Sequence, residues 1–315
     1  MSNIPSLPPR WLVLAAFAAL YLTWGLTYFF IRMAIETIPP FLMAGARFMS
    51  AGLVLYAFVR PRGERPTFAQ WKDALVIGFF LLLIGNGGVA WAELRVPSSL
   101  TALLVAIVPL WMILLEWLRG GERPGSALFA GLAAGFCGIA LIALSRDQNG
   151  RMLAEPIGVL TLLTSSFCWA IGSLYSRRAK KTQSVLQFIA MQMIAGGALQ
   201  LTTGAMLGEV SEFHWPALSR ASLLAFAYLV IGGAIIGFTA YAWLLQVSTP
   251  AHVSTYAYVN PLIAVLFGCT FGHEAITSSI LLGGALIVCA VTLIVSRGKK
   301  NPAPAKRDLE PVMVE

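Results

Sequence analysis

Residues 109–122 read PLWMILLEWLRGGE, and residues 261–274 read PLIAVLFGCTFGHE. The two stretches share a proline at the start, a glutamate at the end and an apolar run between them. The match continues at the same offset of 152 residues with a glycine and a cysteine: Gly131 and Gly283, Cys137 and Cys289. Four residue types that recur at one spacing indicate an internal duplication of the chain.

The first part of the chain repeats at a slightly different offset. At 145 residues the aligned pairs are Trp24 and Trp169, Arg32 and Arg177, Arg47 and Gln192, and Gly52 and Gly197. These pairs divide the chain into a first repeat over residues 11–147 and a second over residues 148–296. We expect an N-terminal tail at residues 1–10 and a disordered, basic, proline-rich tail at residues 297–315.

The composition indicates a membrane protein. Of 315 residues, 58% are hydrophobic and 11% are charged, whereas a soluble domain carries about 25% charged residues. This excludes an ordinary cytosolic enzyme, a nucleic-acid-binding module and a disordered chain. Ten apolar runs are long enough to cross a hydrocarbon core of about 30 Å as helices: Trp11–Ile35, Pro40–Val59, Ala74–Trp91, Ser99–Leu118, Gly125–Leu144, Ile157–Tyr175, Val185–Leu207, Leu223–Leu245, Val253–Phe271 and Ile276–Val295.

The distribution of basic residues predicts the orientation. Sixteen Lys and Arg residues fall at the ends and loops on one side of the predicted bundle, and four fall on the other. Since basic residues are retained in the cytoplasm, both termini are predicted there. Each repeat holds five crossings, so the second copy enters from the opposite side. We therefore predict an all-α membrane protein of ten transmembrane helices in two inverted five-helix repeats.

These features resemble the EamA-type family of the drug/metabolite transporter superfamily. The resemblance covers nearly the whole chain and rests on short motifs at residues 22–25 (LTWG), 45–48 (GARF), 108–109 (VP), 121–122 (GE), 168–170 (CWA), 256–261 (YAYVNP) and 272–274 (GHE). It implies a bacterial inner-membrane protein that exports amino acids or related small metabolites. It implies no cofactor.

Pro109 and Pro261 are matching prolines inside membrane helices. Each removes a main-chain donor and leaves the carbonyl four residues earlier without its usual partner. Paired interruptions of this kind are typical of a midplane binding site and of the bending that alternating access requires. We expect both prolines to be hinges; the alternative is a kink that neighbouring helices tolerate.

Arg47 is an intramembrane cation and therefore a candidate for function. It lies about 10 Å from the outer interface, since it follows Pro40 by seven residues at 1.5 Å each. Its guanidinium could bind a substrate carboxylate through two hydrogen bonds. The alternative is a structural ion pair, for which Glu93 is the obvious partner. Arg32 lies one turn from Glu36, which could pair with it.

Polar and aromatic side chains recur at helical spacing along four of the predicted helices. The candidate substrate-binding residues among them are Trp24, Thr27, Tyr28, Asn86, Trp169, Ser173, Tyr256, Tyr258 and Asn260, in addition to Arg47. Ser165 and Ser166 share the face of Trp169 and Ser173. Such a wall would bind solutes that are partly apolar and partly zwitterionic. The alternative is that these aromatic residues only fill the bundle or anchor it at the interface.

Glu93 and His252 are the candidates for proton coupling, because burial near the membrane could change their protonation. His252 is also explained as a residue at a helix end. The three aspartates lie outside the apolar runs, and no zinc-protease, nucleophile-elbow or ATP-binding motif occurs, which argues against an enzyme.

The predicted function is an alternating-access exporter, either proton-coupled or facilitative, and the alternative is a passive channel. The expected partners are a small-molecule substrate and the lipid bilayer. We expect a monomer rather than a dimer, no metal and no nucleic acid.

Overall fold

The computed structural model describes residues 8–60, 65–120, 126–146, 150, 152–182, 184–248, 253, 256–274 and 277–297. These residues form helices joined by short turns, and the β-structure among them is one isolated bridge between Arg146 and Met152. The predicted all-helical class is confirmed. The predicted C-terminal tail lies outside the described residues, apart from Arg297.

The first half of the chain contributes eight labelled elements. They are α1 (Arg10–Ala34), α2 (Pro40–Val59), α3 (Phe68–Ile77), the π-helix η2 (Gly78–Gly87), α4 (Gly88–Ala92), α5 (Ser98–Val105), α6 (Val108–Leu118) and α7 (Ser126–Ala143). The elements α3, η2 and α4 follow one another without a break, and only Ala106 and Ile107 separate α5 from α6.

The second half follows the same order. Its elements are α8 (Pro156–Ser176), α9 (Val185–Met206), α10 (Glu209–Glu212), η3 (Trp215–Ala217), α11 (Arg220–Tyr228), the π-helix η4 (Leu229–Ile236), α12 (Gly237–Val247), α14 (Tyr256–Thr270) and α15 (Ser278–Arg297). Here α11, η4 and α12 are continuous.

Among the described residues, most of each predicted apolar run is helical, with a break at Ala106 and Ile107 inside the run Ser99–Leu118. Within the described residues, seven segments are long and apolar enough to cross a membrane, and three more are shorter apolar helices: Phe129–Ile142, Val259–Thr270 and Ser278–Ala290. The chain is therefore a multi-pass helical membrane protein. Exposed apolar side chains along these helices, such as Leu53 at 52% and Leu224 at 70%, are compatible with a lipid environment.

Local sequence signals set several of the helix starts. Thr67 and Gln70 form a capping box that begins α3, with each side chain bonded to the other residue's main-chain N–H. Ser184 and Ser219 accept hydrogen bonds from the first turns of α9 and α11. Pro40 and Pro156 occupy first-turn positions, where the missing donor costs nothing.

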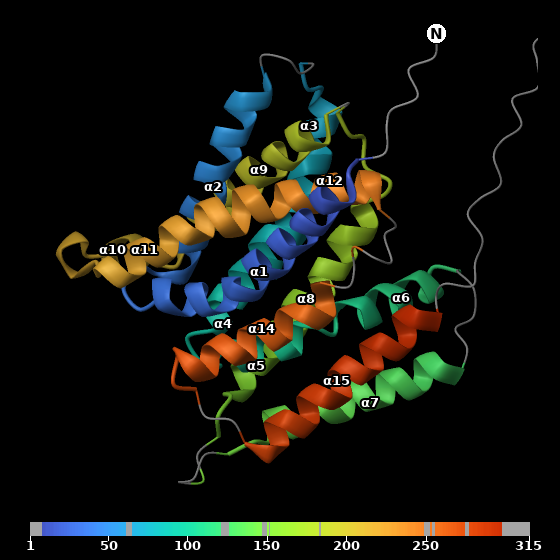
Figure 1. The fold of residues 1–315 in the computed structure, drawn as a ribbon. Coiled ribbons are helices and arrows are strands. Elements are labelled where there is room, and N and C mark those ends of the chain that lie inside the picture. The colour runs from blue at the N-terminus through green and yellow to red at the C-terminus, as the bar shows by residue number, and fades with distance from the viewer. Residues whose placement is uncertain are drawn as a thin grey trace, which may run out of the picture.

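Two helix pairs join the halves of the chain. In Figure 1, α2 lies beside α9, and α7 lies beside α15. A Cβ atom placed on Gly197 would lie 2.7 Å from the main-chain nitrogen of Met49, and one on Gly138 would lie 2.6 Å from the carbonyl oxygen of Gly283. At these two glycines main chain therefore meets main chain, and a larger residue would not fit.

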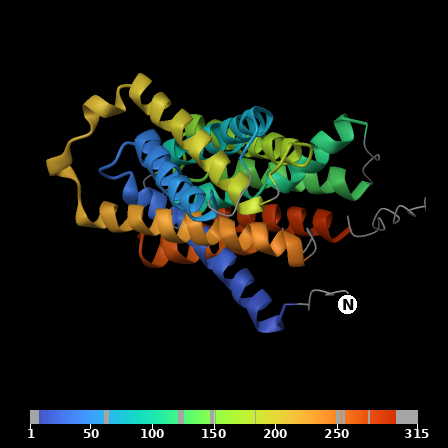
Figure 2. The same cartoon turned by 90° about the horizontal axis from the view of Figure 1, so that it is seen from above.

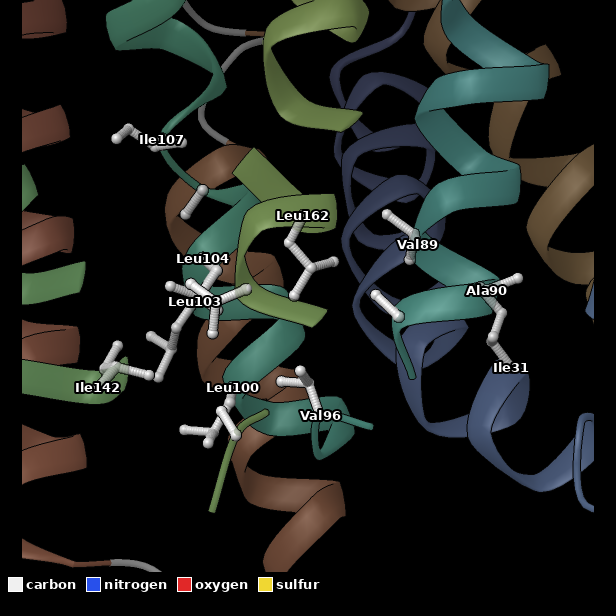
Figure 3. Packing of buried hydrophobic residues seen from close by; sticks show 14 of the residues in the cluster. Ile31, Val89, Ala90, Val96, Leu100, Leu103, Leu104, Ile107, Ile142 and Leu162 are labelled. Atoms are coloured by element: carbon white, nitrogen blue, oxygen red, sulfur yellow. The ribbon is translucent and has the colours of Figure 1, made fainter. Parts of the chain in front are cut away.

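The largest apolar core surrounds α5. Figure 3 shows Leu100, Leu103 and Leu104 of this helix between Ile142 of α7 and Leu162 of α8. Leu104 and Leu162 are fully buried. In the view from above (Figure 2), the N-terminal end of α1 projects beyond the neighbouring helices, which agrees with the exposure of its first turns.

The helix breaks differ from the expected matching pair. Pro109 stands in the first turn of α6, directly after the break at Ala106 and Ile107. Pro261 lies inside the continuous helix α14. The irregularity that both halves share is instead the π-helix, η2 in the first half and η4 in the second, which overlap at the offset of 152 residues. A π-helix has one extra residue per turn and is frequent at functional sites.

Candidate functional site

A cavity lies between the two halves of the chain. Its volume is about 110 Å³. Since one water molecule needs about 10–15 Å³ of such a volume, the cavity has room for several water molecules. Ten of the fourteen candidate residues line it: Trp24, Thr27, Tyr28, Arg47, Asn86, Pro109, Trp169, Tyr256, Asn260 and Pro261.

Four candidates lie elsewhere or outside the described part of the chain. Ser173 is not among the residues that line the cavity, and its hydroxyl donates to the carbonyl of Trp169 on its own helix at 2.7 Å. Glu93 is fully buried but does not line the cavity. His252 and the side chain of Tyr258 lie outside the described residues.

The cavity also contains residues outside the candidate set. Ser165 and Ser166 line it, one turn before Trp169 on α8. Their position on the face of Trp169 is visible in the sequence, and the structure places this turn at the cavity instead of the turn of Ser173. Gly85, Phe238 and several aliphatic residues also line the cavity, and the sequence analysis did not single them out as site residues.

Arg47 is anchored by the main chain of the opposite half. It is 2% exposed, its Nε donates to the carbonyl of Leu229 in η4 at 3.1 Å, and its guanidinium carbon lies 4.7 Å from the ring centre of Phe48. Within the described residues no ion pair joins Arg47 to Glu93. The expected alternative of a direct pair with Glu93 is therefore wrong in this conformation.

Trp24 forms the second contact to η4. Its Nε1 donates to the carbonyl of Gly233 at 3.2 Å, and its ring meets those of Tyr256 at 5.0 Å and Phe238 at 5.2 Å, both edge to face. A Cβ atom on Gly237 would lie 2.4 Å from Trp24 Nε1. Glycine at 237 is therefore required for the indole to reach the cavity wall.

Main-chain carbonyls of η2, the π-helix of the first half, likewise accept hydrogen bonds from side chains of the second half. Ser165 Oγ donates to the carbonyl of Ile84 at 2.9 Å, and Gln200 Nε2 donates to that of Leu82 at 2.7 Å. Thus carbonyls in each π-helix accept from two helices of the other half. Three of the four donors, Trp24, Arg47 and Ser165, also line the cavity, so the wall of the cavity is tied to both π-helices.

One end of the bundle contains three partly or fully buried carboxylates, and we name it the carboxylate end after Glu93, Glu209 and Glu274. Glu274 accepts hydrogen bonds from Ser98 N at 2.7 Å, Ser98 Oγ at 2.6 Å and Ser99 N at 2.9 Å. We call these three bonds the Glu274 contact. They satisfy orphan donors at the start of α5 and hold it to the loop between α14 and α15.

Glu209 makes a similar contact at the same end. Its carboxylate accepts from Phe41 N at 3.2 Å and Leu42 N at 2.8 Å, in the first turn of α2. A negative charge at a helix N-terminus is favourable. Two loops of the second half are therefore bonded to helix starts of the first half at this end.

Glu93, directly after α4, is the third carboxylate of this end. Its side chain is fully buried, and within the described part of the chain neither carboxylate oxygen has a hydrogen-bond partner. Arg32 donates to the main-chain carbonyl of Glu93 and not to its carboxylate. Burial raises the pKa of the Glu93 carboxyl well above its ordinary value, Glu274 raises it further, and Arg32 and Arg47 lower it.

The opposite end carries an exposed ion pair and a hydrogen-bonded aspartate. Arg177 and Glu116 form a salt bridge at 2.5 Å, with side chains 60% and 46% exposed. Asp73 accepts from Tyr175 Oη and from Lys180 N, each at 2.7 Å. These groups connect α6 and α3 to the end of α8.

The described residues contain no group of three His, Cys, Asp or Glu side chains that could hold a metal ion. The seam cavity, with one cation, two amides, hydroxyls and aromatic rings, is suited to binding a small organic solute.

Sequence comparison identifies the family. The profile of the EamA-like transporter family matches residues 10–144 and again residues 156–296. The chain belongs to the EamA-like transporter family. It is accordingly a membrane transporter, and its family and relatives point away from an enzyme.

Several EamA-like relatives match over nearly the whole chain. The uncharacterized inner membrane transporter YedA of Escherichia coli strain K12 is 37% identical over 95% of this chain and 94% of its own. The uncharacterized transporter YvbV of Bacillus subtilis is 28% identical over 91% and 93%, and PagO of Salmonella typhimurium is 28% identical over 89% and 92%. The protein is therefore a multi-pass bacterial inner-membrane protein.

A solved crystal structure shares the fold of this EamA-like chain. It covers 91% of this chain and 98% of its own at a TM-score of 0.62, with 22% sequence identity. At this identity the likeness concerns the fold alone.

Proposed function

We propose that this EamA-like protein exports amino acids or related small metabolites by alternating access, with the seam cavity as the substrate site. The observation that carries the proposal is the cavity itself, which both halves line. Arg47 supplies a buried cation for a carboxylate. Asn260 is 5% exposed and its Oδ1 has no partner in the described residues, so it can accept from a donor such as an ammonium group.

Two inverted five-helix repeats are part of this proposal. The separate matches of the family profile to residues 10–144 and 156–296 support a duplication. So do the two glycine-lined pairs, since α2 and α9 correspond at the offset of 145 residues, and α7 and α15 correspond at 152. A pseudo-two-fold axis between repeats places partner helices in this way.

We propose that the carboxylate end faces the exterior, because the basic residues concentrate at the other end. The contacts of Glu274 and Glu209 would then hold the exterior end closed. In transport, the halves rock, the Glu274 contact opens, and the cavity faces outward. Pro109, at the break between α5 and α6, is the hinge that the geometry supports better than Pro261.

The test is transport by purified protein in lipid vesicles. Amino acids are screened one by one, with and without a pH gradient, and saturable counterflow is the expected result for a carrier. Flux without counterflow would instead identify a passive channel. No flux of any amino acid would overturn the proposed substrate class.

Matched variants locate the site. We expect Arg47→Ala and Trp169→Ala to lower counterflow at least tenfold while the protein remains in the membrane. The controls are Arg178→Ala and Trp215→Ala, which remove the same residue types from exposed positions and should stay within twofold of wild type. Near wild-type counterflow by both cavity variants would remove the cavity as the substrate site.

A further inference from the structure

The Glu93 carboxyl group is the least satisfied polar group near the seam. Glu93 follows the last residue of the helical segment α3–η2–α4 and lies one turn after Val89, which lines the cavity. Its side chain is 0% exposed, and both oxygens lack a partner among the described residues. Such a group, if ionised, would cost several kcal/mol in the interior; the cost disappears when the carboxyl is protonated.

The charged neighbours do not supply the missing partner. Arg32 of α1 bonds the main chain of Glu93, Arg47 of α2 bonds Leu229, and Glu274 bonds the start of α5. Tyr28 of α1 also interacts electrostatically with the Glu93 carboxyl group. With two cations already directed to carbonyl groups and a second carboxylate nearby, the closed end favours a neutral Glu93.

The Glu274 contact lies only a few residues along the chain from this buried group. Ser98 and Ser99, five and six residues after Glu93, are held by Glu274. If these bonds open, the short connection between α4 and α5 is released and water can reach the carboxyl. An exposed carboxyl has an ordinary pKa near 4.3 and ionises at neutral pH.

We propose that Glu93 is the proton-binding site of this carrier, and that the carboxylate end closes only when Glu93 carries a proton. The proton comes from exterior water: the carboxylate gains an O–H bond on closing, hydronium becomes water, and the reverse occurs on opening. This inference rests on the proposed alternation of the two ends, but it requires no particular substrate.

The sign of the pH effect follows directly. The closed state binds one more proton than the open state, so closing is favoured at low pH and opening is favoured as pH rises through the pKa of the closed state. One proton per closure changes the open-to-closed ratio by at most about tenfold per pH unit.

The experiment measures the opening of the cavity without substrate. Ser166, on the cavity wall, is replaced by Cys in a variant whose four native cysteines are Ala, and a membrane-impermeant maleimide is added from the exterior between pH 5 and pH 9. Rates are corrected for the thiolate fraction with a small thiol. We expect the corrected rate to rise several-fold across the range, and Glu93→Gln to reduce this change to less than twofold.

Three controls separate Glu93 from other titrating groups. His273→Gln removes the titratable side chain beside Glu274, and Glu116→Gln removes a carboxylate at the opposite end; both should keep the pH dependence. Glu93→Asp should also keep it, which covers the case that Glu93→Gln fails to fold. A flat wild-type profile, or an unchanged slope in Glu93→Gln, would overturn the proposal. Because this readout involves no transport, it stands or fails independently of the substrate screen.

Discussion

The substitution Glu274→Gln tests how firmly the carboxylate end is held. In wild type, one carboxylate accepts all three bonds of the Glu274 contact. Glutamine has the same shape but only one acceptor, so it can still face Ser98 while its NH₂ group meets the N–H of Ser99, donor against donor. The variant loses at least one bond to a charged group, which is worth about 1.5–3 kcal/mol.

This loss corresponds to a factor of about 10 to 150 in the equilibrium between held and released states. Hydrogen exchange followed by mass spectrometry on a peptide spanning residues 94–104 measures it, because the amides of Ser98 and Ser99 are the released donors. We expect their exchange to accelerate by this factor in Glu274→Gln.

The matched control is Glu155→Gln at the same end. Glu155 pairs with Arg95 at 3.6 Å and its side chain is 61% exposed, and exposed pairs contribute about 0–1 kcal/mol. In Glu155→Gln, the rate of hydrogen exchange over residues 94–104 should change by less than about fivefold. If Glu274→Gln exchanged within twofold of wild type while folded, the contact would not hold the end closed.

Three further substitutions test the packing at the seam. Trp24→Phe keeps an aromatic ring but leaves the carbonyl of Gly233 without the indole donor, which should cost about 1–3 kcal/mol and lower the midpoint of thermal unfolding; an unchanged midpoint would contradict the role of this bond. Gly138→Val should destabilise by about 1–3 kcal/mol or more, since its side chain meets main chain, whereas Cys137→Val at the neighbouring exposed position should be nearly neutral in the same melt. Leu104→Ala should cost about 2–5 kcal/mol, because this side chain is fully buried; a loss below 1 kcal/mol would mean that the core around α5 is loosely packed.

Hydrophobic runs predicted the positions of most of the long helical segments. Pro40–Val59 matches α2 at both ends, and Val185–Leu207 differs from α9 by one residue. The third segment begins earlier than predicted, at Phe68 instead of Ala74, because the capping box at Thr67 and Gln70 starts the helix in its polar turn.

The π-helices could not be predicted in this way. Residues 78–87 read GFFLLLIGNG, and an apolar run has no polar face whose periodicity could reveal one extra residue per turn. The carbonyls that the wide turns offer to Arg47 and Trp24 were invisible for the same reason. The sequence therefore directed attention to a carboxylate partner for Arg47, although its bonded partner is the main chain of Leu229.

Contacts between side chains that are distant in sequence also could not be predicted. Glu36 is one turn from Arg32, but Arg32 reaches the carbonyl of Glu93 instead. The choice between Ser173 and Ser165 likewise depends on how far α8 slides along η2, which a helical pattern within α8 does not specify. Eight polar or aromatic residues of the cavity were among the candidates because such groups are few in a chain that is 58% hydrophobic.

The glycine-lined pairs α2–α9 and α7–α15 have a consequence for the energetics of rocking. Ordinary helix pairs interlock through side chains, and turning one against the other forces rotamers over barriers. At Gly197 and Gly138 main chain lies against main chain, so fewer rotamers have to change at these two positions. The two halves can therefore turn against each other at these pairs with little side-chain repacking. The energy barrier to reorientation would then be set by the hydrogen bonds at the ends of the bundle and not by the packing at its middle.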